Sequence, residues 1–468
     1  MKVRKLKVGP ILGETTANQA RIWGRADLRM SPSGPKRGFG VARWRKSGEA
    51  DYGPPLFFKM NPNFDMTGVL VVTDLEPDQV YDYQMGWFFA DAELTDLRPG
   101  IGLKWEKANS ASFKTGVNDN NADRSFIVGS CRYLLRFLGG SFFDSRGDKT
   151  YKSILEQINR NVQTDAILMT GDQIYADDMN VIGSDNALEE FNKRYREAFC
   201  QPYIRELMSR IPTYMTLDDH EIEDNWPAHS SEKDLVVKYP NAMHAYLTYQ
   251  MSHSPLHKTI GNKLTGPPDH FWYKFSDGCC DFFVTDVRTE RNLNEDPEVR
   301  EIISGEQMAA LEAWLLDESG RIKFIVSSVP FFPDASSSSG DKWDGFPKQR
   351  THLIEVIRKN KVKKTVFLSG DIHCSCTTTL TIPGDPDLQI VSIISSAFFW
   401  PYPHPKKDKY LLEGQLPGFG DAGPYQVNRV STFQATDNFT RVNASATGLT
   451  ITIYSRKGER LDQCSINF

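Results

Sequence analysis

Six short apolar runs punctuate the middle of this 468-residue chain, and each ends in polar residues that can bind a metal ion or a phosphate group. Apolar runs bounded by turn residues are typical of fully buried strands. Open α/β sheets bind ligands at the carboxyl ends of such strands. The pattern therefore predicts that carboxylates, a thiol and histidines gather on one rim of the fold. The polar residues that follow the six runs are Ser130-Cys131, Gly171-Asp172, Asp218-Asp219-His220, Asp286 with Arg288, Ser327-Ser328, and Gly370-Asp371 with His373.

Three parts of the chain differ in their pattern. Residues 1–118 alternate polar and apolar positions between turn clusters, which predicts a small antiparallel β-sandwich; residues 75–81 resemble a turn of immunoglobulin-like and fibronectin-III-like modules. From residue 119 to 430, strands alternate with helical patterns, so we expect an α/β sandwich of mixed sheets flanked by helices. Helices are expected at 151–162, 187–210 with a break at Pro202, 242–251, 304–318 and 349–360. Residues 431–468 predict a β-hairpin that completes the α/β region.

Composition narrows the classes of partner. The 55 basic and 60 acidic residues give a net charge of −5, which offers no electrostatic basis for a nucleic-acid or anionic-membrane partner. No apolar run approaches the roughly 18 residues that a membrane-spanning helix needs. The basic N-terminus is followed by Val8-Gly9-Pro10 and not by a signal-peptide core, so we expect a cytoplasmic protein, or an exported one if a leader has been removed. Seven cysteines without framework spacing favour reduced thiols.

Three of the strand ends carry the same ligand chemistry. Asp172, with Tyr175 three residues later, can place two oxygen donors around one cation, and its second oxygen can reach another. Two cations about 3.5–4 Å apart are a standard device for displacement at phosphorus. The acidic run at 218–224 would repel itself unless a cation compensated it. Asp371 and His373 add a carboxylate and an imidazole. Singly, each reads as a helix cap or a solvated loop; together they predict a metal centre.

These blocks resemble a known superfamily. Gly171-Asp172, Asp219-His220-Glu221 and Gly370-Asp371-Ile372-His373 are similar to successive motifs of the calcineurin-like metallophosphoesterases. Finer details resemble the PhoD-type alkaline phosphatases within it: Gly129-Ser130-Cys131, Tyr175, Asp218-Asp219-His220-Glu221, Asp286-Val287-Arg288 and residues 342–347. The likeness extends over the whole chain, including the N-terminal sandwich. It implies a metallophosphatase catalytic domain at 119–430 and an enzyme that hydrolyses phosphoric esters of small molecules or lipids.

The resemblance also implies a binuclear or multinuclear metal centre. One ion, ferric iron, is implied beside thiolate and phenolate donors, which favour a highly charged transition metal; its ligands are Cys131, Asp172, Tyr175 and His373. The second ion shares one carboxylate and takes oxygen donors: Asp172, Asp219, Asp371 and, as a further candidate, Asn225. The family implies calcium there, whereas zinc and manganese occur across the superfamily. Asp218 either joins these ligands or orients a neighbour.

The implied mechanism is in-line attack on phosphorus by a metal-bridging hydroxide, with His220 contacting or protonating the leaving oxygen. Arg288 is the candidate for a nonbridging phosphate oxygen; a surface position or a salt bridge to Asp286 is the equal alternative. The expected substrate is a phosphomonoester or a phosphodiester. The sequence leaves open which of the two is preferred, the physiological substrate and the oligomeric state.

Other readings of the sequence fit less well. A cysteine-dependent phosphatase needs arginine six residues after Cys131, where Phe137 stands. The G-x-G-x-x-G match at 418–423 comes after no strand and opens no helix, so a dinucleotide site is excluded by its context. Two alternatives remain: a phosphodiesterase or phospholipase-type hydrolase with the same metals, and a catalytically dead scaffold or adhesion protein that uses the β-sandwich.

Overall fold

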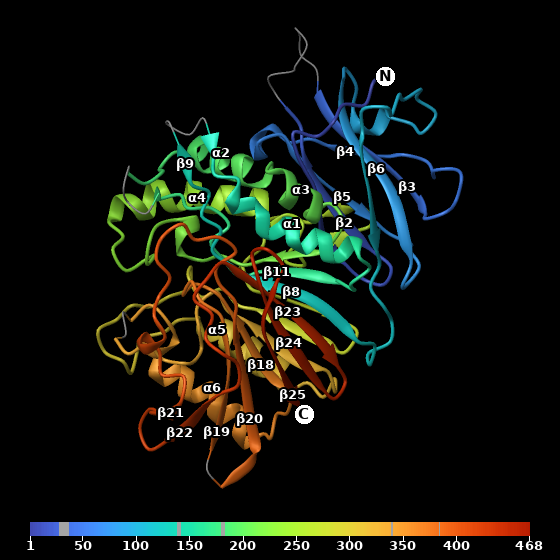
Figure 1. The fold of residues 1–468 in the computed structure, drawn as a ribbon. Coiled ribbons are helices and arrows are strands. Elements are labelled where there is room, and N and C mark those ends of the chain that lie inside the picture. Colours follow the sequence, from blue (N-terminus) through green and yellow to red (C-terminus); the bar gives the residue numbers. More distant parts are fainter. Residues whose placement is uncertain (28–36, 138–141, 179–182, 338–339, 383) are drawn as a thin grey trace.

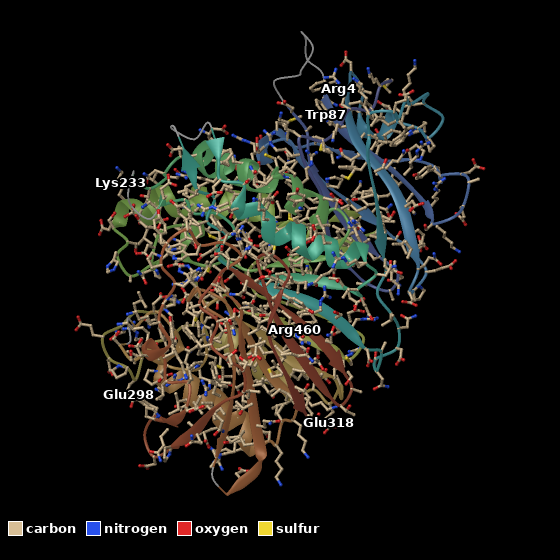
Figure 2. All side chains as sticks on the ribbon, in the orientation of Figure 1. Arg4, Trp87, Lys233, Glu298, Glu318 and Arg460 are labelled. Carbon is tan, nitrogen blue, oxygen red and sulfur yellow. The ribbon has the colours of Figure 1, made fainter. Side chains whose placement is uncertain are left out.

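The N-terminal part is a sandwich of two antiparallel sheets. The computed structural model describes residues 1–27, 37–137, 142–178, 183–337, 340–382 and 384–468 (Figure 1). Leu12, Ile22, Met85 and Trp87 of the two sheets share one core, and Arg4 covers the Trp87 ring at 5.3 Å (Figure 2). The predicted β-sandwich is confirmed. One sheet holds β1 (Val8–Thr15), β2 (Ala20–Arg25) and β5 (Thr67–Val72); the other holds β4 (Leu56–Lys59), β3 (Arg37–Lys46), β6 (Val80–Ala90) and β7 (Asn109–Lys114).

Two mixed sheets face each other in the rest of the chain. Phe126 of the first packs edge to face against Phe282 and Phe324 of the second, with ring centroids 5.3 and 5.2 Å away. The six-stranded sheet has the order β12 (Thr213–Met215), β11 (Ala166–Met169), β8 (Arg124–Gly129), β23 (Asn438–Ser445), β24 (Gly448–Ser455), β25 (Arg460–Asn467). The eight-stranded sheet has the order β15 (Tyr273–Asp277), β16 (Cys280–Val284), β17 (Ile322–Val326), β18 (Thr365–Ser369), β20 (Asp385–Ile394), β19 (Cys376–Ile382), β22 (Tyr425–Arg429), β21 (Gly414–Leu416).

Parallel pairing fixes the direction of the strands that matter most. Strand β11 pairs in parallel with β8 and with β12, and β16, β17, β18 and β20 are parallel to one another. Side chains on both faces of these strands are buried, as expected for parallel strands covered on both sides. Each group of parallel strands therefore presents its carboxyl ends at one edge of its sheet.

Helices cover the outer faces of both sheets (Figure 1). Four share a core with the six-stranded sheet: α1 (Arg146–Asn159), α2 (Leu188–Phe199), α3 (Pro202–Met208) and α4 (Tyr239–Tyr246). Helices α5 (Gly305–Leu315) and α6 (Pro347–Lys359) pack on the eight-stranded sheet. The predicted helices are confirmed, including the break at Pro202. Helix α1 begins five residues before the predicted start, and Asp144 accepts the N–H of its first residue, Arg146, at 2.8 Å.

Shorter elements complete the fold. They are the hairpins β9 (Arg136–Phe137) with β10 (Phe142–Phe143) and β13 (Thr259–Ile260) with β14 (Lys263–Leu264), the 3₁₀ turns η2 (Pro62–Phe64), η3 (Leu94–Asp96), η6 (Asp219–Glu221), η9 (Trp343–Gly345) and η10 (Lys407–Lys409), and the π-helical turns η7 (Asp234–Lys238) and η8 (Leu247–Met251). None of the helices in the described ranges is both long enough and apolar enough to span a bilayer.

The C-terminal segment contributes three strands where the sequence predicted two. The expected hairpin is present as β24 and β25, with Gly458 at a φ of +82° in its turn. Strand β23 precedes it and pairs antiparallel with β8, so that Thr440 lies opposite Val128. The end of the chain therefore forms half of the six-stranded sheet and borders the strand that leads to Cys131.

The N-terminal sandwich is fixed to the helices by polar contacts. Asp65 accepts from Arg25 at 2.8 and 2.7 Å, and from Arg196 of α2 at 2.8 Å. The indole N–H of Trp23 donates to the Thr248 carbonyl at 2.9 Å. Because both oxygens of the Asp65 carboxylate have charged partners, the negative charge of Asp65 is offset at this junction.

Candidate metal centre

The carboxyl ends of six strands, three from each sheet, meet at one rim. Asp218, after β12, receives hydrogen bonds from Arg288, after β16, at 2.6 Å and from Ser328, after β17, at 2.8 Å. Cys131, after β8, lies 3.3 Å from Asp172, after β11. The gathering of chemically active side chains that the apolar runs predicted is therefore present.

The backbone at this rim is strained. Cys131, Asp172, Asp371 and His373 have φ angles of 54°, 56°, 66° and 52°, in a region that costs a non-glycine residue about 1–3 kcal/mol and recurs at functional sites. Gly171 has a φ of +100°, and a Cβ there would lie 2.4 Å from the Asp218 Cβ. Glycine at 171 thus lets the ends of β11 and β12 approach each other.

One group of donors surrounds Asp172. The ligand atoms of Cys131, Asp172 and His373 all lie within 4.8 Å of one another. The Tyr175 hydroxyl donates to the same Asp172 oxygen that faces the Cys131 thiol, at 3.2 Å. The His373 ring stacks on Trp400 with centroids 3.7 Å apart, which fixes its orientation. The structure thus brings together all four residues that the sequence assigned to the first ion.

A second group of carboxylates adjoins the first. Donor atoms of Asp218, Asp219 and Asp371 lie within 4.8 Å of one another, as do those of Asp172, Asp219 and His220. Asp172 and Asp219 thus link the two groups, as a shared centre for two cations requires. Asn225 is placed differently: its backbone N–H, and not its amide, donates to Asp219 at 2.6 Å.

Several buried polar atoms at the rim lack a hydrogen bond. Asp172 Oδ1, Asp218 Oδ2 and His373 Nε2 have no such partner in the described part of the chain, although buried polar groups nearly always have one. Burial, reinforced by Asp218 and Asp219 against the opposing effect of His220, raises the pKa of Asp172 well above its usual value. A cation would satisfy these atoms and offset the repulsion. Thiol, phenol, imidazole and carboxylates are a donor set that fits a transition metal beside a hard cation.

His220 is held by an acid that the sequence did not single out. Its Nδ1 lies 2.9 Å from Asp177 Oδ2, and its ring lies 4.3 Å from Tyr175. Burial acts to lower the pKa of His220, but Asp219, Asp172 and Asp177 raise it well above the usual value. Because Asp177 occupies Nδ1, Nε2 is the ring nitrogen that faces other groups, and it lies 3.9 Å from Asp224 Oδ1. No motif marks Asp177, because it lies in the loop after the Gly171-Asp172 turn.

Glu221 joins two of the strand ends. Its carboxylate accepts the backbone N–H groups of Asp172 at 3.1 Å, Gln173 at 2.6 Å and Asp218 at 2.9 Å. It also accepts from the Gln250 amide at 3.2 Å. Glu221 therefore sets the spacing of the candidate ligands without being one of them.

Arg288 is fully buried among carboxylates. Besides Asp218, its guanidinium donates to both oxygens of Asp341, at 2.5 and 3.1 Å, and to the Trp226 carbonyl at 3.3 Å. Neither alternative considered for this residue is found: it is not on the surface, and Asp286 accepts its backbone N–H, not its side chain. The guanidinium therefore lies behind Asp218 and Asp219 and keeps the residues around them in position.

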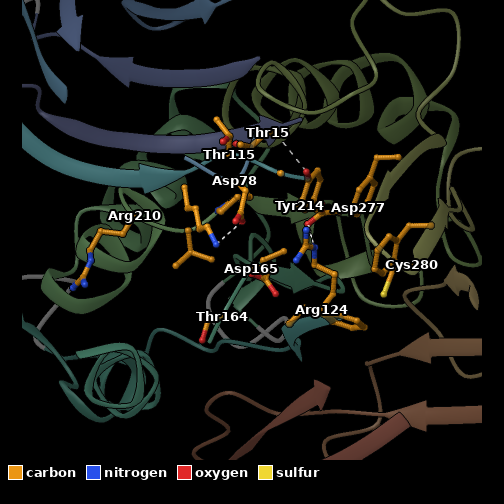
Figure 3. Close-up of a pocket in the computed structure, with 18 residues that line it drawn as sticks. Thr15, Asp78, Thr115, Arg124, Thr164, Asp165, Arg210, Tyr214, Asp277 and Cys280 are labelled. Carbon is orange, nitrogen blue, oxygen red and sulfur yellow. Dashed lines mark hydrogen bonds and ion pairs between the residues drawn. The ribbon is translucent and has the colours of Figure 1, made fainter. Parts of the chain in front are cut away.

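The opposite ends of the same strands border a different site. A cavity of about 60 Å³ lies where β8, β11 and β12 begin, lined among others by Arg124, Asp165 and Pro212 (Figure 3). Arg124 and Asp277 form an ion pair there at 2.8 Å. This cavity is separated from the candidate ligands by the length of the strands.

Comparison with known proteins places the chain in a family. The family model described as PhoD-like phosphatase matches residues 135–400. Alkaline phosphatase D of Bacillus subtilis (strain 168) is 25% identical over 229 residues, a match that spans 42% of this chain but only 36% of that protein. A solved structure of PhoD covers 98% of this chain and 89% of its own, with a TM-score of 0.74 and 16% identity.

A purple acid phosphatase from yellow lupin (Lupinus luteus) seeds has the same fold more distantly. It covers 98% of this chain and 74% of its own, with a TM-score of 0.58 and 12% identity. These likenesses agree with the α/β sandwich preceded by a β-sandwich, and the family model includes five of the six strand ends that meet at the rim. The chain therefore belongs to the PhoD-like phosphatase family.

Proposed function

We propose that this protein is a metal-dependent phosphoric ester hydrolase of the alkaline phosphatase D type. One observation carries the proposal: donor atoms from four strand ends form overlapping groups, each within 4.8 Å, that share Asp172 and Asp219. Metal ions held by these donor atoms would stabilise the charge that develops on the phosphoryl group and would acidify a water molecule for attack on phosphorus. Displacement at phosphorus needs little covalent chemistry from the protein itself.

We assign two ions to this centre on the basis of donor type. Ferric iron suits Cys131, Asp172, Tyr175 and His373, because thiolate and phenolate are anionic donors. Calcium suits the oxygen donors of Asp172, Asp219 and Asp371, with zinc or manganese as the alternatives. The Asn225 side chain remains a candidate ligand for the second ion; the hydrogen bond from its backbone to Asp219 keeps it adjacent.

His220 is the proposed general acid. Asp177 holds its Nδ1, so Nε2 can donate a proton to the leaving oxygen. Asp177 is among the carboxylates that raise the pKa of His220 against the effect of burial, and unlike Asp172 and Asp219 it is not a candidate metal ligand, so its support for the protonated ring does not depend on the state of the metal centre. Arg288 acts as a positioning residue in this proposal. Its donors are committed to Asp218 and Asp341, so it orients these carboxylates and affects phosphate binding only through them.

The catalytic unit in this proposal comprises residues 119–430 together with the strands of 431–468, because β23 pairs with β8. The substrate is a phosphate ester of a small molecule or a lipid. A phosphodiesterase or phospholipase-type hydrolase with the same metals is the rival enzyme. A scaffold that uses the β-sandwich is the rival outside enzymes; the strained backbone and the unsatisfied atoms at the rim argue against it, since a dead site would have no reason to retain them.

Hydrolysis before and after metal removal tests the proposal. Purified protein should release p-nitrophenol from p-nitrophenyl phosphate or from bis(p-nitrophenyl) phosphate. Chelation should abolish this activity, and iron added with calcium should restore it. Activity toward neither ester in metal-supplemented protein, or full activity after exhaustive chelation, would contradict the assignment.

A further inference from the structure

Lys342 reaches the rim from outside the strand ends. Its ammonium nitrogen lies 3.0 Å from Asp371 Oδ2, and only 20% of its side chain is exposed. A lysine normally keeps its charge in water, and ordering its long side chain costs up to about 2 kcal/mol of conformational entropy. The placement of this ammonium beside a candidate metal ligand therefore requires a reason.

The residues on either side of Lys342 are anchored. The Asp341 carboxylate accepts from Arg288 at 2.5 Å and from Arg291 at 2.7 Å. Trp343 is fully buried and donates its indole N–H to Ser327 at 3.1 Å. Lys342 thus projects from a backbone that is fixed at both neighbours, so its ammonium is held in advance at the edge of the site.

The charge of Lys342 is not needed by its neighbours once the site is loaded. Two arginines already offset Asp341. Asp371 is the partner of Lys342 in this structure, but cations at the rim would take over the charge of Asp371. The ammonium would then be a surplus positive charge beside the candidate metal ligand Asp371.

On the basis of the proposed function, we propose that Lys342 binds a nonbridging oxygen of the substrate phosphoryl group and makes the enzyme prefer phosphomonoesters to phosphodiesters. A monoester carries two negative charges above its second pKa of about 6, whereas a diester carries one. The second charge and the third terminal oxygen exist only in the monoester, and a compact ammonium is a point charge suited to such an oxygen. An ammonium at this position therefore discriminates between the two classes.

A purely structural Lys342 has different consequences. If the ammonium only offsets Asp371, its loss changes metal affinity and stability but affects both ester classes equally. The ratio of kcat/KM for the monoester to kcat/KM for the diester is therefore the deciding quantity. The affinity for inorganic phosphate is a second readout, which does not depend on hydrolysis of the monoester.

The test compares Lys342→Met, Lys342→Gln and Lys342→Arg in the metal-loaded full chain. The two neutral variants should lower kcat/KM for p-nitrophenyl phosphate about 100-fold and for bis(p-nitrophenyl) phosphate less than about 5-fold, in keeping with the loss of one charge-assisted contact. The inhibition constant of inorganic phosphate, measured against the diester, should rise about 10-fold or more. Lys342→Arg keeps the charge and should retain most of the wild-type ratio.

Lys348→Met provides the matched control, because Lys348 is six residues away, exposed and paired with Glu298; it should leave the ratio unchanged. Metal content is measured for every variant, and two neutral variants guard against one that does not fold. Equal losses on both esters, or an unchanged phosphate inhibition constant, overturn the role of Lys342. A wild-type protein that cleaves neither ester instead overturns the proposed function.

Discussion

The two ends of β8, β11 and β12 contrast in how their charges are arranged. The cavity at the amino ends has three carboxylates and three cationic side chains in its lining: Asp78, Asp165, Asp277, Lys114, Arg124 and Arg210. At the carboxyl ends, acids cluster within 4.8 Å of one another and buried oxygens lack hydrogen bonds. A balanced site is structurally complete, whereas an acidic, unsatisfied one requires a cation.

Backbone strain shows the same division. Four candidate ligands at the carboxyl ends adopt positive φ angles, and the strands bring them there directly from buried cores. At the amino ends, Asp78 is the one described non-glycine residue of the cavity lining with a positive φ, of 57°, and Arg124 and Asp277 meet from β8 and β15, which belong to different sheets. Electrostatic imbalance and strain, and not the presence of a cavity, therefore distinguish the candidate metal centre from the opposite end of the strands.

Removing one shared carboxylate should produce the largest difference between the two ends. Asp172→Asn should lower hydrolysis of an aryl phosphate about 1,000-fold or more and remove bound metal, because the ions supply several kcal/mol of transition-state stabilisation. Asp277→Asn, at the amino ends, should keep both. Steady-state rates with elemental analysis check this, and equal losses in the two variants would erase the distinction.

Removing a buried guanidinium at the carboxyl ends of the strands should destabilise the protein more than removing one at the amino ends. Arg288→Met removes the cation that pairs with buried Asp218, whereas Asp341 keeps its ion pair with Arg291; loss of the Asp218 pair should cost about 3–5 kcal/mol of unfolding free energy. Arg124→Met should cost less, because the Asp277 side chain is 23% exposed and can be hydrated. Urea unfolding of the two variants measures the difference. A smaller loss in Arg288→Met than in Arg124→Met would argue against the buried network.

Replacing His220 should affect turnover and not metal content. His220→Gln should lower kcat about 100-fold, as expected for loss of a general acid, while Asp177→Asn should lower it about 10-fold through misorientation of the ring. The decisive readout is leaving-group dependence: esters with poor leaving groups should suffer most. A loss independent of the leaving group would assign His220 to another role.

The metal-free protein should lose stability as pH rises. Burial raises the pKa of Asp172, Asp218 and Asp371 above their usual values, that of Asp218 to about 8. The native state then binds protons more tightly than the unfolded state, so the unfolding free energy should fall between about pH 4 and pH 8 by on the order of 2 kcal/mol. The lowered pKa of His373 opposes this trend only below about pH 6.5.

Metal-loaded protein should show the reverse trend, because cations bind the deprotonated ligands. Urea unfolding at several pH values, with and without metal, tests both halves of this expectation. Parallel pH profiles for the two forms would show that the rim carboxylates are not where the ions bind.

The strand ends and the candidate ligands at them could be found in the sequence because the signal is local. An apolar run that leads into Gly171-Asp172 or Gly370-Asp371 marks both a buried strand and the carboxylate at its end. Asp177, Asp341 and Lys342 lie in loops without a periodic pattern, and only tertiary packing brings them to His220, Arg288 and Asp371. Strand β23 was missed for a related reason: of its two neighbours in the sheet, β24 and β8, the one that joins it to the rest of the sheet is β8, more than 300 residues earlier in the sequence.

Anomalous X-ray scattering from crystals of the active protein tests the central claim most directly. Data collected on both sides of the iron absorption edge should show a peak within ligand distance of Cys131 Sγ, Asp172 Oδ2 and Tyr175 Oη, with a second density peak between Asp219 and Asp371. Crystals that hydrolyse substrate yet show no density at either position would contradict the account.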